Sequence, residues 1–502
     1  MLVTLLGGCM VCSTWASNLV WVLMGANWVL EGRWKEKWQM ARASRLLQAY
    51  LVFYLLLMVG MLWTENTAAG WSLLQVKLPL LVVPLVMLTT KPLSSRQRPV
   101  ALVGYVGTVL VVSFIAAIRM ITMPDLPYRE AVPYISHIRF ALNCCMAIVI
   151  LVVGGKWSVV SGQWLMRIVR WIFAVWLLVF LLLIRSYTAV AVLLVVSFVL
   201  LFRAVIVSRR RWPLLALWIL LVGGATALVV REVHSYYDMV PMATQPLKEY
   251  TAGGRPYEHA CDGIIENGNY ISNYVCRDEM RAAWMRRSTL PYDGLTASGY
   301  SVESTLLRYL NASGLTKDSV GVAAMTAADV DAVERGVANP VYESGDPLRK
   351  MVYVMLLERE FYVHTHAVAG FTMLQRFELW RATWNVECEH PWIGVGTGDA
   401  VDAMHAELEA MDSELVGTTK KSHNEYLSLL AMLGFIGFGL IVVMFVRPLF
   451  FKHSTLNTQR STLIIAWAMA ILISFLTEDT LDTLAGILFC TWFLAVRQTK
   501  NT

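Results

Sequence analysis

The residue best suited to chemistry is His423, which stands at the head of an apolar run and is followed by Asn424. A histidine accepts a proton near neutral pH, as the activation of a hydroxyl group requires. The apolar run carries Gly434, Gly437 and Gly439, which let a neighbouring helix approach closely. We therefore predict that His423 is catalytic and that Asn424 orients it or the substrate. The alternative for His423 is a helix N-cap at the membrane interface.

A second group of candidates consists of cations at the ends of apolar runs. Charges at membrane depth are costly unless they are paired or face a wet cavity, so they are functional candidates. Guanidinium groups bind phosphate through two parallel hydrogen bonds, and the set therefore predicts an anionic ligand such as a diphosphate. For Lys77, Arg119 and Arg231 the alternative is a side chain that only reaches out to the interface. The members are Lys77, Arg119, Arg139, Arg185, Arg231, Arg376 and Arg381.

Two of these arginines have a more specific context. Arg185 lies in a very tight turn between two apolar runs, where an arginine is an unusual choice. Arg376 precedes Trp380 by four residues, and helical spacing puts both on one face. The neighbouring Arg381 has the alternative of a solvated charge.

A glycine-rich run, Gly394-Val395-Gly396-Thr397-Gly398, lies between Arg376 and His423. Such a run is weak evidence for a phosphate loop by itself. We interpret it as a turn that brings Arg376 and His423 together, in which the backbone of Gly396 can add a donor to a phosphate. The acidic pair Glu478-Asp479 lies at the outer end of the next-to-last apolar run. Three roles are open for it: it polarises His423, it balances the charge of the cations, or it is only a charged part of the loop.

These motifs resemble a known family. An arginine before a tryptophan, the pattern P-x-x-G-x-G from Pro391 to Gly396, and His423-Asn424 before a glycine-spaced span are similar to the O-antigen ligase and polymerase superfamily. The resemblance implies a membrane-embedded, lipid-carrier-dependent glycosyltransferase of the GT-C type. It further implies transfer of an O-antigen glycan from undecaprenyl diphosphate to a lipid A–core sugar hydroxyl, at the periplasmic face of the bacterial inner membrane.

The resemblance also implies roles for individual residues. The reaction is expected to be a metal-independent inverting displacement, in which Arg376 and Arg185 neutralise the leaving diphosphate and His423 lies near the acceptor. No cofactor is implied, and no cysteine has the spacing of a metal site with histidine. The predicted substrate-binding residues are Lys77, Arg139, Arg381, Asn424 and Gly396.

The elements that must position these residues are apolar runs. The chain has 502 residues, of which 57% are hydrophobic and 16% charged, a composition too apolar for a soluble protein of this length. It predicts an all-α polytopic membrane protein with about eleven or twelve transmembrane helices. The formal net charge of +6 does not indicate nucleic-acid binding, because most Lys and Arg lie in short loops. The predicted spans are 3–29, 46–63, 72–90, 99–118, 136–154, 167–184, 187–205, 213–230, 426–446, 461–476 and 481–496.

Charge orients the predicted spans, because basic connections stay in the cytoplasm. The large polar segment 231–425 then lies on the outer side, as a mostly helical periplasmic domain. It separates an N-terminal bundle, 1–230, from C-terminal helices, 426–502. The first thirty residues are too short for two full crossings, which leaves the count at eleven or twelve and the side of the N-terminus open. The basic connections are 33–45, 91–98, 156–170, 203–211 and 447–460.

The outer segment has predicted features of its own. Residues 327–335 begin with acidic residues and 348–364 carry apolar positions at helical spacing, so both are predicted helices. Cys261 and Cys276 lie in an oxidising compartment and would close a short loop, which predicts a disulfide. The insertion 231–374 departs from compact ligases and leaves the acceptor open.

Three other functions remain as alternatives. An O-antigen polymerase transfers glycan to another lipid-linked glycan, and a protein O-oligosaccharyltransferase transfers it to Ser or Thr. A polysaccharide or lipid transporter is the alternative of another class, because it also has many spans and intramembrane charges. A transporter needs polar sites at the midplane, whereas the polar residues here gather at the outer face, which favours the ligase.

Overall fold

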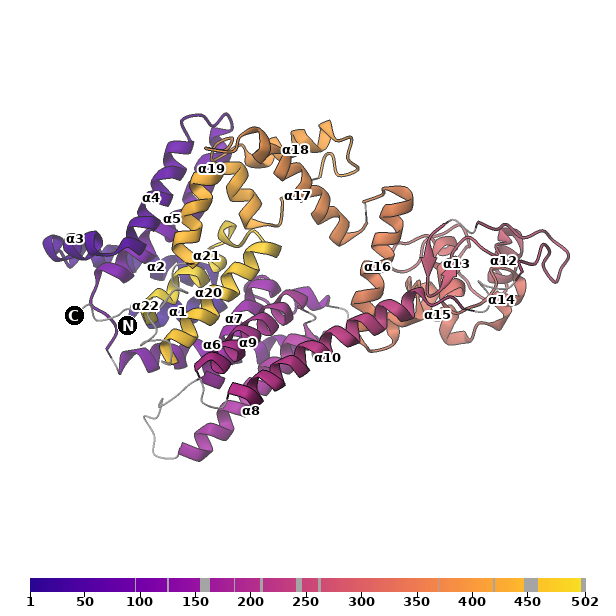
Figure 1. Ribbon diagram of the computed structural model, residues 1–502, viewed down its shortest axis with the longest axis horizontal. Coiled ribbons are helices and arrows are strands. Elements are labelled where there is room, and N and C mark those ends of the chain that lie inside the picture. The colour runs from indigo at the N-terminus through magenta and orange to yellow at the C-terminus, as the bar shows by residue number, and fades with distance from the viewer. Residues whose placement is uncertain are drawn as a thin grey trace. The chain divides into compact units, whose positions relative to one another are not determined.

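The computed structural model consists almost entirely of helices, so the all-α architecture predicted from the sequence is confirmed (Figure 1). Among the described residues, the strands β1 (Ile265–Glu266) and β2 (Asn269–Tyr270) form one short antiparallel hairpin, which the sequence did not predict. The structure describes all residues except 95, 124–125, 154–162, 185, 208–210, 241–245, 261–262, 369, 419, 447–458 and 498–502.

The chain divides into two compact units. The first, called here the membrane unit, consists of Met1–Trp218 and Glu378–Thr502. The second, called the inserted unit, consists of Ile219–Phe377. Helices α10 (Arg211–Tyr237) and α17 (Thr372–Glu389) each continue from one unit into the other.

The membrane unit contains most of the helices that are long and apolar enough to cross a membrane. Within the described parts of the chain six helices meet this condition, or seven if α3 (Trp34–Ala43) and α4 (Arg45–Gly60), bent by 93°, form one span. The multi-pass character is thereby confirmed, while the count of eleven or twelve spans stays a prediction. The six lie within α5 (Thr67–Thr89), α6 (Gln97–Thr122), α8 (Gln163–Leu183), α9 (Tyr187–Val207), α10, and α19 (Glu425–Ile441) with its π-helical extension Val442–Val446.

The first thirty residues form two helices, α1 (Leu2–Cys12) and α2 (Thr14–Leu30), where the sequence predicts a single span. Ser13 separates them in an extended conformation, and its hydroxyl caps α2 by accepting a hydrogen bond from the amide of Ala16 at 3.1 Å. At 11 and 17 residues the two helices are about 17 and 26 Å long, shorter than the ~30 Å of a bilayer core. The break in this segment therefore lies at Ser13.

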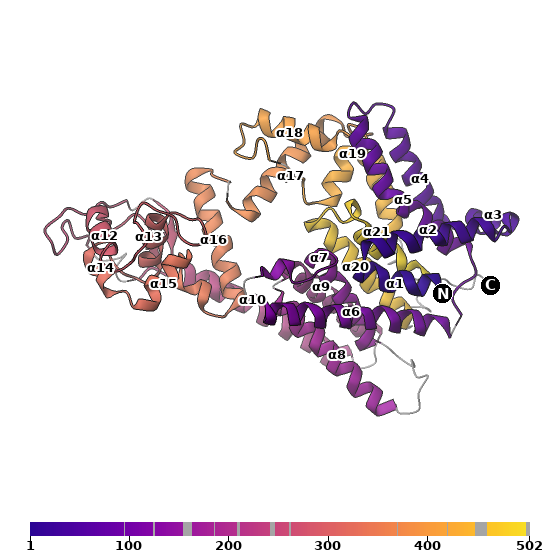
Figure 2. The same ribbon diagram turned by 180° about the vertical axis from the view of Figure 1, so that it is seen from behind.

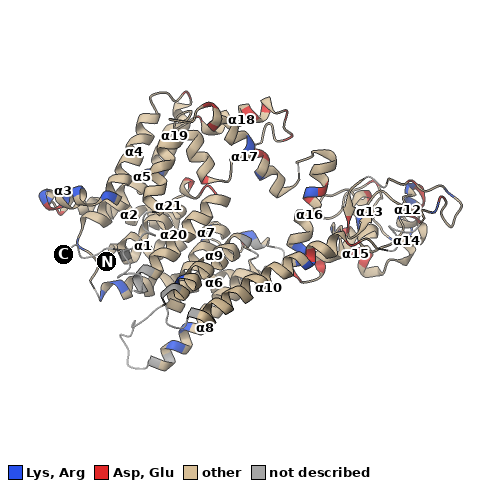
Figure 3. Ribbon diagram, in the orientation of Figure 1, with Lys and Arg blue, Asp and Glu red and all other residues tan. Residues whose placement is uncertain are grey.

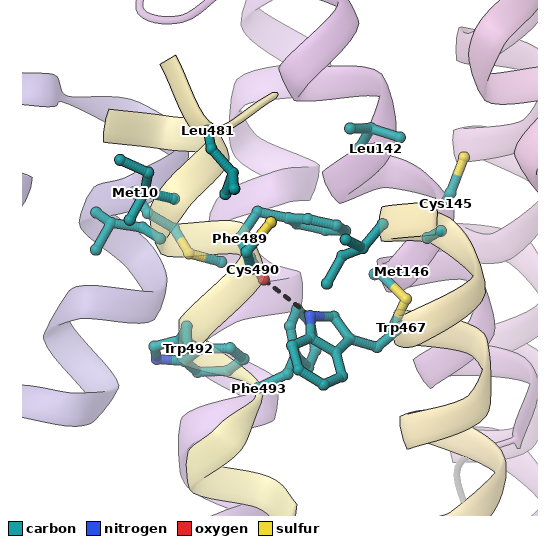
Figure 4. Packing of buried hydrophobic residues seen from close by; sticks show 14 of the residues in the cluster. Met10, Leu142, Cys145, Met146, Trp467, Leu481, Phe489, Cys490, Trp492 and Phe493 are labelled. Atoms are coloured by element: carbon teal, nitrogen blue, oxygen red, sulfur yellow. Dashed lines mark hydrogen bonds between the residues drawn. The ribbon is translucent and has the colours of Figure 1, made fainter. Parts of the chain in front are cut away.

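The core of the membrane unit joins helices from both ends of the chain. Helix α1 packs on α6, α7 (His137–Val153) on α20 (Gln459–Thr477), and α5 on α21 (Leu484–Trp492). Trp467 of α20 donates its indole N–H to the carbonyl of Phe489 in α21 at 2.9 Å (Figure 4). Cys145 and Cys490 are buried in this core as small apolar groups. Helices α4, α5 and α19 lie side by side (Figures 1 and 2), and they support the loops described below.

The inserted unit has a small core of its own around Trp284, Leu306 and Val333. Lys, Arg, Asp and Glu recur along the inserted unit, whereas the helices of the membrane unit are uncharged along most of their length (Figure 3). The helices predicted at 327–335 and 348–364 are confirmed. Cys276 is a buried free thiol, and Cys261, its expected disulfide partner, lies outside the described residues. The helices are α12 (Arg277–Trp284), α13 (Val302–Ala312), α14 (Ser319–Ala324), α15 (Ala327–Arg335) and α16 (Pro347–Thr365).

Helix α19 is interrupted at Gly434, whose φ of 61° and ψ of −165° do not occur in a helix. An interruption leaves carbonyl groups without their helical partners, which a membrane environment does not tolerate. The loop after α17 supplies new hydrogen-bond donors for these carbonyl groups. The amides of Val395 and Gly396 donate to the carbonyls of Ala431 at 2.8 Å and Met432 at 3.2 Å. The glycine-rich run is therefore part of the backbone structure of a broken span.

The second half of α19 is completed by the same loop. The amide of Phe435 donates to the carbonyl of Pro391 at 2.8 Å. A Cβ atom on Gly434 would lie 2.3 Å from the carbonyl carbon of Trp392, so only glycine permits this approach. The sequence predicts a neighbouring helix against these glycines. Among the described residues it is the loop that approaches Gly434, and nothing lies within 4 Å of a Cβ built on Gly439.

Gly434→Ala should lower the free energy of unfolding by at least about 2 kcal/mol, because backbone strain adds to a clash that a rigid loop cannot relieve. Gly439→Ala is the matched control in the same helix, and we expect it to be neutral or slightly stabilising. Thermal unfolding of the purified protein in detergent measures both. Equal transition temperatures for the two variants would contradict the assigned role of the loop.

Candidate active site

The loop that carries His423 is held from two sides in an unusual backbone conformation. His423 has a φ of 52°, in the left-handed region that non-glycine residues seldom adopt. Its amide donates to Oδ2 of Asp479 at 3.1 Å, and the indole N–H of Trp380 donates to the carbonyl of Ser422 at 2.9 Å. Such a conformation persists where the surroundings impose it, and residues of this kind cluster at functional sites.

Asn424 serves as the N-cap of α19. Its side-chain oxygen accepts hydrogen bonds from the amides of Tyr426 at 3.1 Å and Leu427 at 3.3 Å. The capping role that the sequence offers as an alternative for His423 is thus carried out by Asn424. The imidazole of His423 is half-buried and makes no hydrogen bond or ion pair with any residue that the structure describes. Its ring nitrogens are therefore available to a substrate.

Asp479 anchors the His423 loop. Its carboxylate is 6% exposed and accepts hydrogen bonds from the hydroxyl groups of Ser428 at 2.8 Å and Ser422 at 3.3 Å, in addition to the His423 amide. The contact with His423 runs through the backbone and does not involve the imidazole. Asp479 consequently fixes the position of the catalytic candidate through the backbone, and its carboxylate lies near enough to His423 for a charge interaction.

Lys77 lies in a buried cluster of charges beside this loop. Its side chain is fully buried, and Nζ lies 3.0 Å from Asp482 and 3.7 Å from Glu425. The ammonium group also donates to the carbonyl of Leu481 at 3.1 Å. Lys421 reaches the other carboxylate oxygen of Asp482 at 2.7 Å. Lys77 is thus engaged by acids of the chain itself.

Arg139 has a similar arrangement. Its guanidinium lies 3.3 Å from Glu478 and donates to the carbonyl of Asp479 at 3.0 Å and the hydroxyl of Thr483 at 3.3 Å. Of the roles considered for the Glu478-Asp479 pair, Glu478 therefore balances a cation. Arg139 links α7 to the segment between α20 and α21.

The charges of this cluster nearly balance. Three cations, Lys77, Arg139 and Lys421, face four carboxylates, so the cluster offers no surplus of positive charge to a diphosphate. Lys421 has 49% of its side chain exposed, and it is the member that faces solvent most. The sequence analysis did not single it out. The carboxylates belong to Glu425, Glu478, Asp479 and Asp482.

A cavity of about 310 Å³ lies beside the charge cluster. Helix α5 and the glycine loop line it, and Asp402, Lys421 and Asp482 supply its charged groups. The amide of Gly396 is taken up by the carbonyl of Met432, so it is not available to a ligand in this structure. A lining of apolar helix surface and a few charged groups suits a ligand with a polar headgroup.

The predicted arginines lie elsewhere or outside the described residues. Arg185 is among the residues that the structure does not describe. Arg376 is half-buried on α17 and belongs to the inserted unit, whereas Arg381, on the same helix, is exposed and belongs to the membrane unit. The structure therefore gathers Lys77, Arg139 and the His423 loop within the membrane unit.

Helix α17 also carries a carboxyl group that the sequence analysis did not single out. Glu387 is buried, and neither of its carboxylate oxygens has a hydrogen-bond partner among the described residues. Burial raises the pKa of Glu387 to about 7. A buried carboxyl group that titrates near neutral pH is a functional candidate, because it can hold or release a proton there.

Comparison with known families finds a match for a segment that contributes to this site. Residues 336–442 match the family model described as O-antigen ligase, a segment that contains α17, the glycine loop, His423 and the break in α19. This segment of the chain is thus similar to the O-antigen ligase family. The resemblance stated from the motifs is confirmed by this match, and a glycosyltransferase-like ligase or polymerase is the class of enzyme that it supports. No curated protein matches the chain.

Proposed function

We propose that the protein transfers a glycan from a lipid-linked diphosphate to an acceptor hydroxyl at the membrane surface, as an O-antigen ligase does. The observation that carries the proposal is the His423 loop. An imidazole with no hydrogen-bond partner among the described residues stands in an imposed backbone conformation, beside a broken span and within the segment that matches the ligase family. This arrangement suits a general base that meets a substrate from the lipid phase.

In the proposed reaction the acceptor oxygen attacks the anomeric carbon, and the bond from that carbon to the diphosphate oxygen breaks. The acceptor proton goes to a ring nitrogen of His423, and the electron pair leaves with the lipid diphosphate. Attack from the face opposite to the leaving group inverts the anomeric configuration. Arg376 and Arg185 are proposed to neutralise the leaving group.

The finer parts of the proposal are the donor, the acceptor and the location. We propose undecaprenyl diphosphate as the carrier, a lipid A–core sugar as the acceptor, and the periplasmic face of the bacterial inner membrane as the location. The family match and the basic connections of the chain, which favour an outer-face site, support these assignments. A gene deletion tests them, because loss of a ligase removes polymer from lipopolysaccharide while lipid-linked polymer accumulates. Attached single repeats without polymer would indicate a polymerase.

Arg376→Lys should lower turnover by at least about tenfold and Arg376→Ala by more. A lysine offers a point charge where the planar guanidinium makes two parallel hydrogen bonds. The charge on the leaving diphosphate grows toward the transition state, so the effect should appear in kcat more than in KM. We expect the same of Arg185. A purified-protein assay with a lipid-linked donor measures both constants.

Arg335→Lys is the matched control for this series, because Arg335 is an exposed arginine of α15 in the inserted unit. Its turnover should equal that of the unchanged protein. Full activity of both Arg376→Lys and Arg185→Lys would mean that these cations do not bind the diphosphate through their planar groups.

A further inference from the structure

A second and larger cavity of the membrane unit has no role in the mechanism above. It has a volume of about 970 Å³ and is formed by the loop between α4 and α5, the turn after α17 and the first turns of α18 (Ala400–Ala410). We call it the tryptophan pocket, because Trp63 and Trp392 line it together with the carboxylates of Glu65, Glu389, Asp399 and Asp402. Most of its lining belongs to the segment that matches the ligase family.

The two tryptophans of the pocket differ in exposure. Trp392 is 70% exposed. The indole N–H of Trp63 is buried and has no acceptor among the described residues, so it is a donor without a partner. An indole ring combines a large apolar face with a polar N–H. This combination fits a sugar ring, which has apolar C–H faces and hydroxyl groups at its edge.

The carboxylates of the pocket divide into a structural group and an open group. Asp399 is structural, because its two oxygens accept hydrogen bonds from the amides of Glu65 at 2.8 Å and Asn66 at 2.7 Å. The side chains of Glu65 and Glu389 are exposed and make no hydrogen bond or ion pair with described residues. An ionised carboxylate only accepts hydrogen bonds, and hydroxyl groups are donors that match it.

The charge of the pocket excludes an anionic occupant. Among the described residues no lysine or arginine lines it, whereas four carboxylates do. A phosphate or diphosphate placed there would meet like charges at short range, which is unfavourable in a partly enclosed site. The occupant must therefore be neutral or cationic, and rich in hydroxyl donors.

The position of the pocket connects it with the proposed reaction. Asp402 lines both the tryptophan pocket and the smaller cavity beside Lys421 and Asp482. Asp402 also accepts a hydrogen bond from the side chain of Asn66 at 2.7 Å, which fixes it between the two cavities. A ligand can thus extend from an aromatic, acidic pocket to a cavity with a cation at its edge.

We propose that the tryptophan pocket binds a saccharide. The inference rests on the proposed glycan transfer, because the pocket adjoins the cavity beside the charge cluster of the candidate active site. Trp392 supplies a stacking face, and Asp402, Glu65 and Glu389 accept hydrogen bonds from sugar hydroxyl groups. The sugar can belong to the acceptor or to the donor glycan, which share this chemistry. A different role for Trp392 is a membrane-interface anchor, since its ring packs on Phe435 at 6.3 Å between centroids.

Binding of soluble sugars to the purified full-length protein tests the proposal. The probes are core oligosaccharide freed of lipid A and O-antigen oligosaccharide released from its carrier, measured by calorimetry in detergent. Trp392→Ala and Asp402→Asn should each weaken binding of one or both probes by about tenfold or more, since the loss of a side chain that anchors a ligand commonly has an effect of this size. Trp392→Phe should keep most of the affinity. Inorganic diphosphate should not compete.

The outcomes separate the possible sources of the sugar. Weaker binding of the core oligosaccharide alone assigns the pocket to the acceptor, and weaker binding of the O-antigen oligosaccharide alone assigns it to the donor. Trp384→Ala is the control, because Trp384 is a 48% exposed tryptophan of α17 that does not line the pocket. Unchanged affinity for both probes in Trp392→Ala and Asp402→Asn overturns the proposal. So does an equal loss in Trp384→Ala.

The binding experiment tests the tryptophan pocket independently of the catalytic role proposed for His423. His423→Ala should bind both probes as the unchanged protein does, because His423 does not line the pocket. Weakened binding in the pocket variants together with normal transfer in His423→Ala would reject the catalytic role and keep the pocket. Unchanged binding in the pocket variants together with loss of transfer in His423→Ala would reject the pocket alone.

Discussion

His423→Ala is expected to lower the rate of glycan transfer by roughly 10²–10⁴-fold, the usual contribution of a general base. The ring is half-buried and makes no contact by hydrogen bond or ion pair within the described residues, so its removal should change the stability of the protein little. The backbone around it is held by Asp479 and Trp380 through main-chain groups, and these bonds do not depend on the imidazole, so an alanine at position 423 can keep them. The loss should therefore be one of chemistry.

The left-handed conformation at position 423 calls for a second variant. Asparagine adopts this conformation more readily than alanine, and it cannot take up a proton in the relevant pH range. His423→Asn should thus be as inactive as His423→Ala but fold at least as well. Near-normal transfer by His423→Asn, at equal protein level, would remove His423 from the mechanism.

The inserted unit offers a matched control. His366 also has a left-handed backbone, with a φ of 54°, and it is an exposed residue at the end of α16. His366→Ala should keep full transfer. Equal losses in both histidine variants would point to an effect of the backbone and not of the imidazole.

The sequence predicts the helices of this protein well where a helix is continuous. The apolar runs at 72–90 and 99–118 coincide with α5 and α6, because a long apolar helix is marked by composition alone. The interruptions at Ser13 and Gly434 are less visible. A single serine or glycine in an apolar run usually fits a helix, and whether it breaks one depends on what lies opposite. At Gly434 that is a loop which begins about forty residues earlier.

The candidate site could be predicted only in part. His423 was found because a proton acceptor beside an apolar span is rare in sequence. The partners of Lys77 were not found, because Asp482 lies 405 residues further along the chain and nothing local announces the pairing. Glu425, two residues after His423, is a residue whose pairing the sequence does indicate, although it is not among the predicted site residues. A carboxylate at the first helical position of a membrane span requires a partner, and Lys77 is that partner.

Lys77→Met provides the sharpest test of what this pairing does, and we expect it to cost about 3–5 kcal/mol of the free energy of unfolding. Removal of the ammonium group leaves Glu425, which is 1% exposed, without a paired cation. It also removes one of the two cations that pair with Asp482. Methionine keeps the length and flexibility of the lysine stem, so the loss reports on charge more than on packing. Arg335→Met is the control, because the ion pairs of Arg335 are exposed and such pairs contribute about 0–1 kcal/mol.

A double variant separates the structural role of Lys77 from the substrate-binding role predicted by the sequence. If Lys77 mainly stabilises buried carboxylates, Lys77→Met combined with Glu425→Gln should recover part of the lost stability, because the uncompensated charge is gone. Thermal unfolding in detergent measures this coupling, and transfer activity is measured on the same samples. If Lys77 instead contacts the donor, Lys77→Met should unfold at the normal temperature yet fail in transfer, and Glu425→Gln should restore nothing. The burial of Nζ between two carboxylates favours the first result, since an ammonium group already neutralised has little attraction left for a diphosphate.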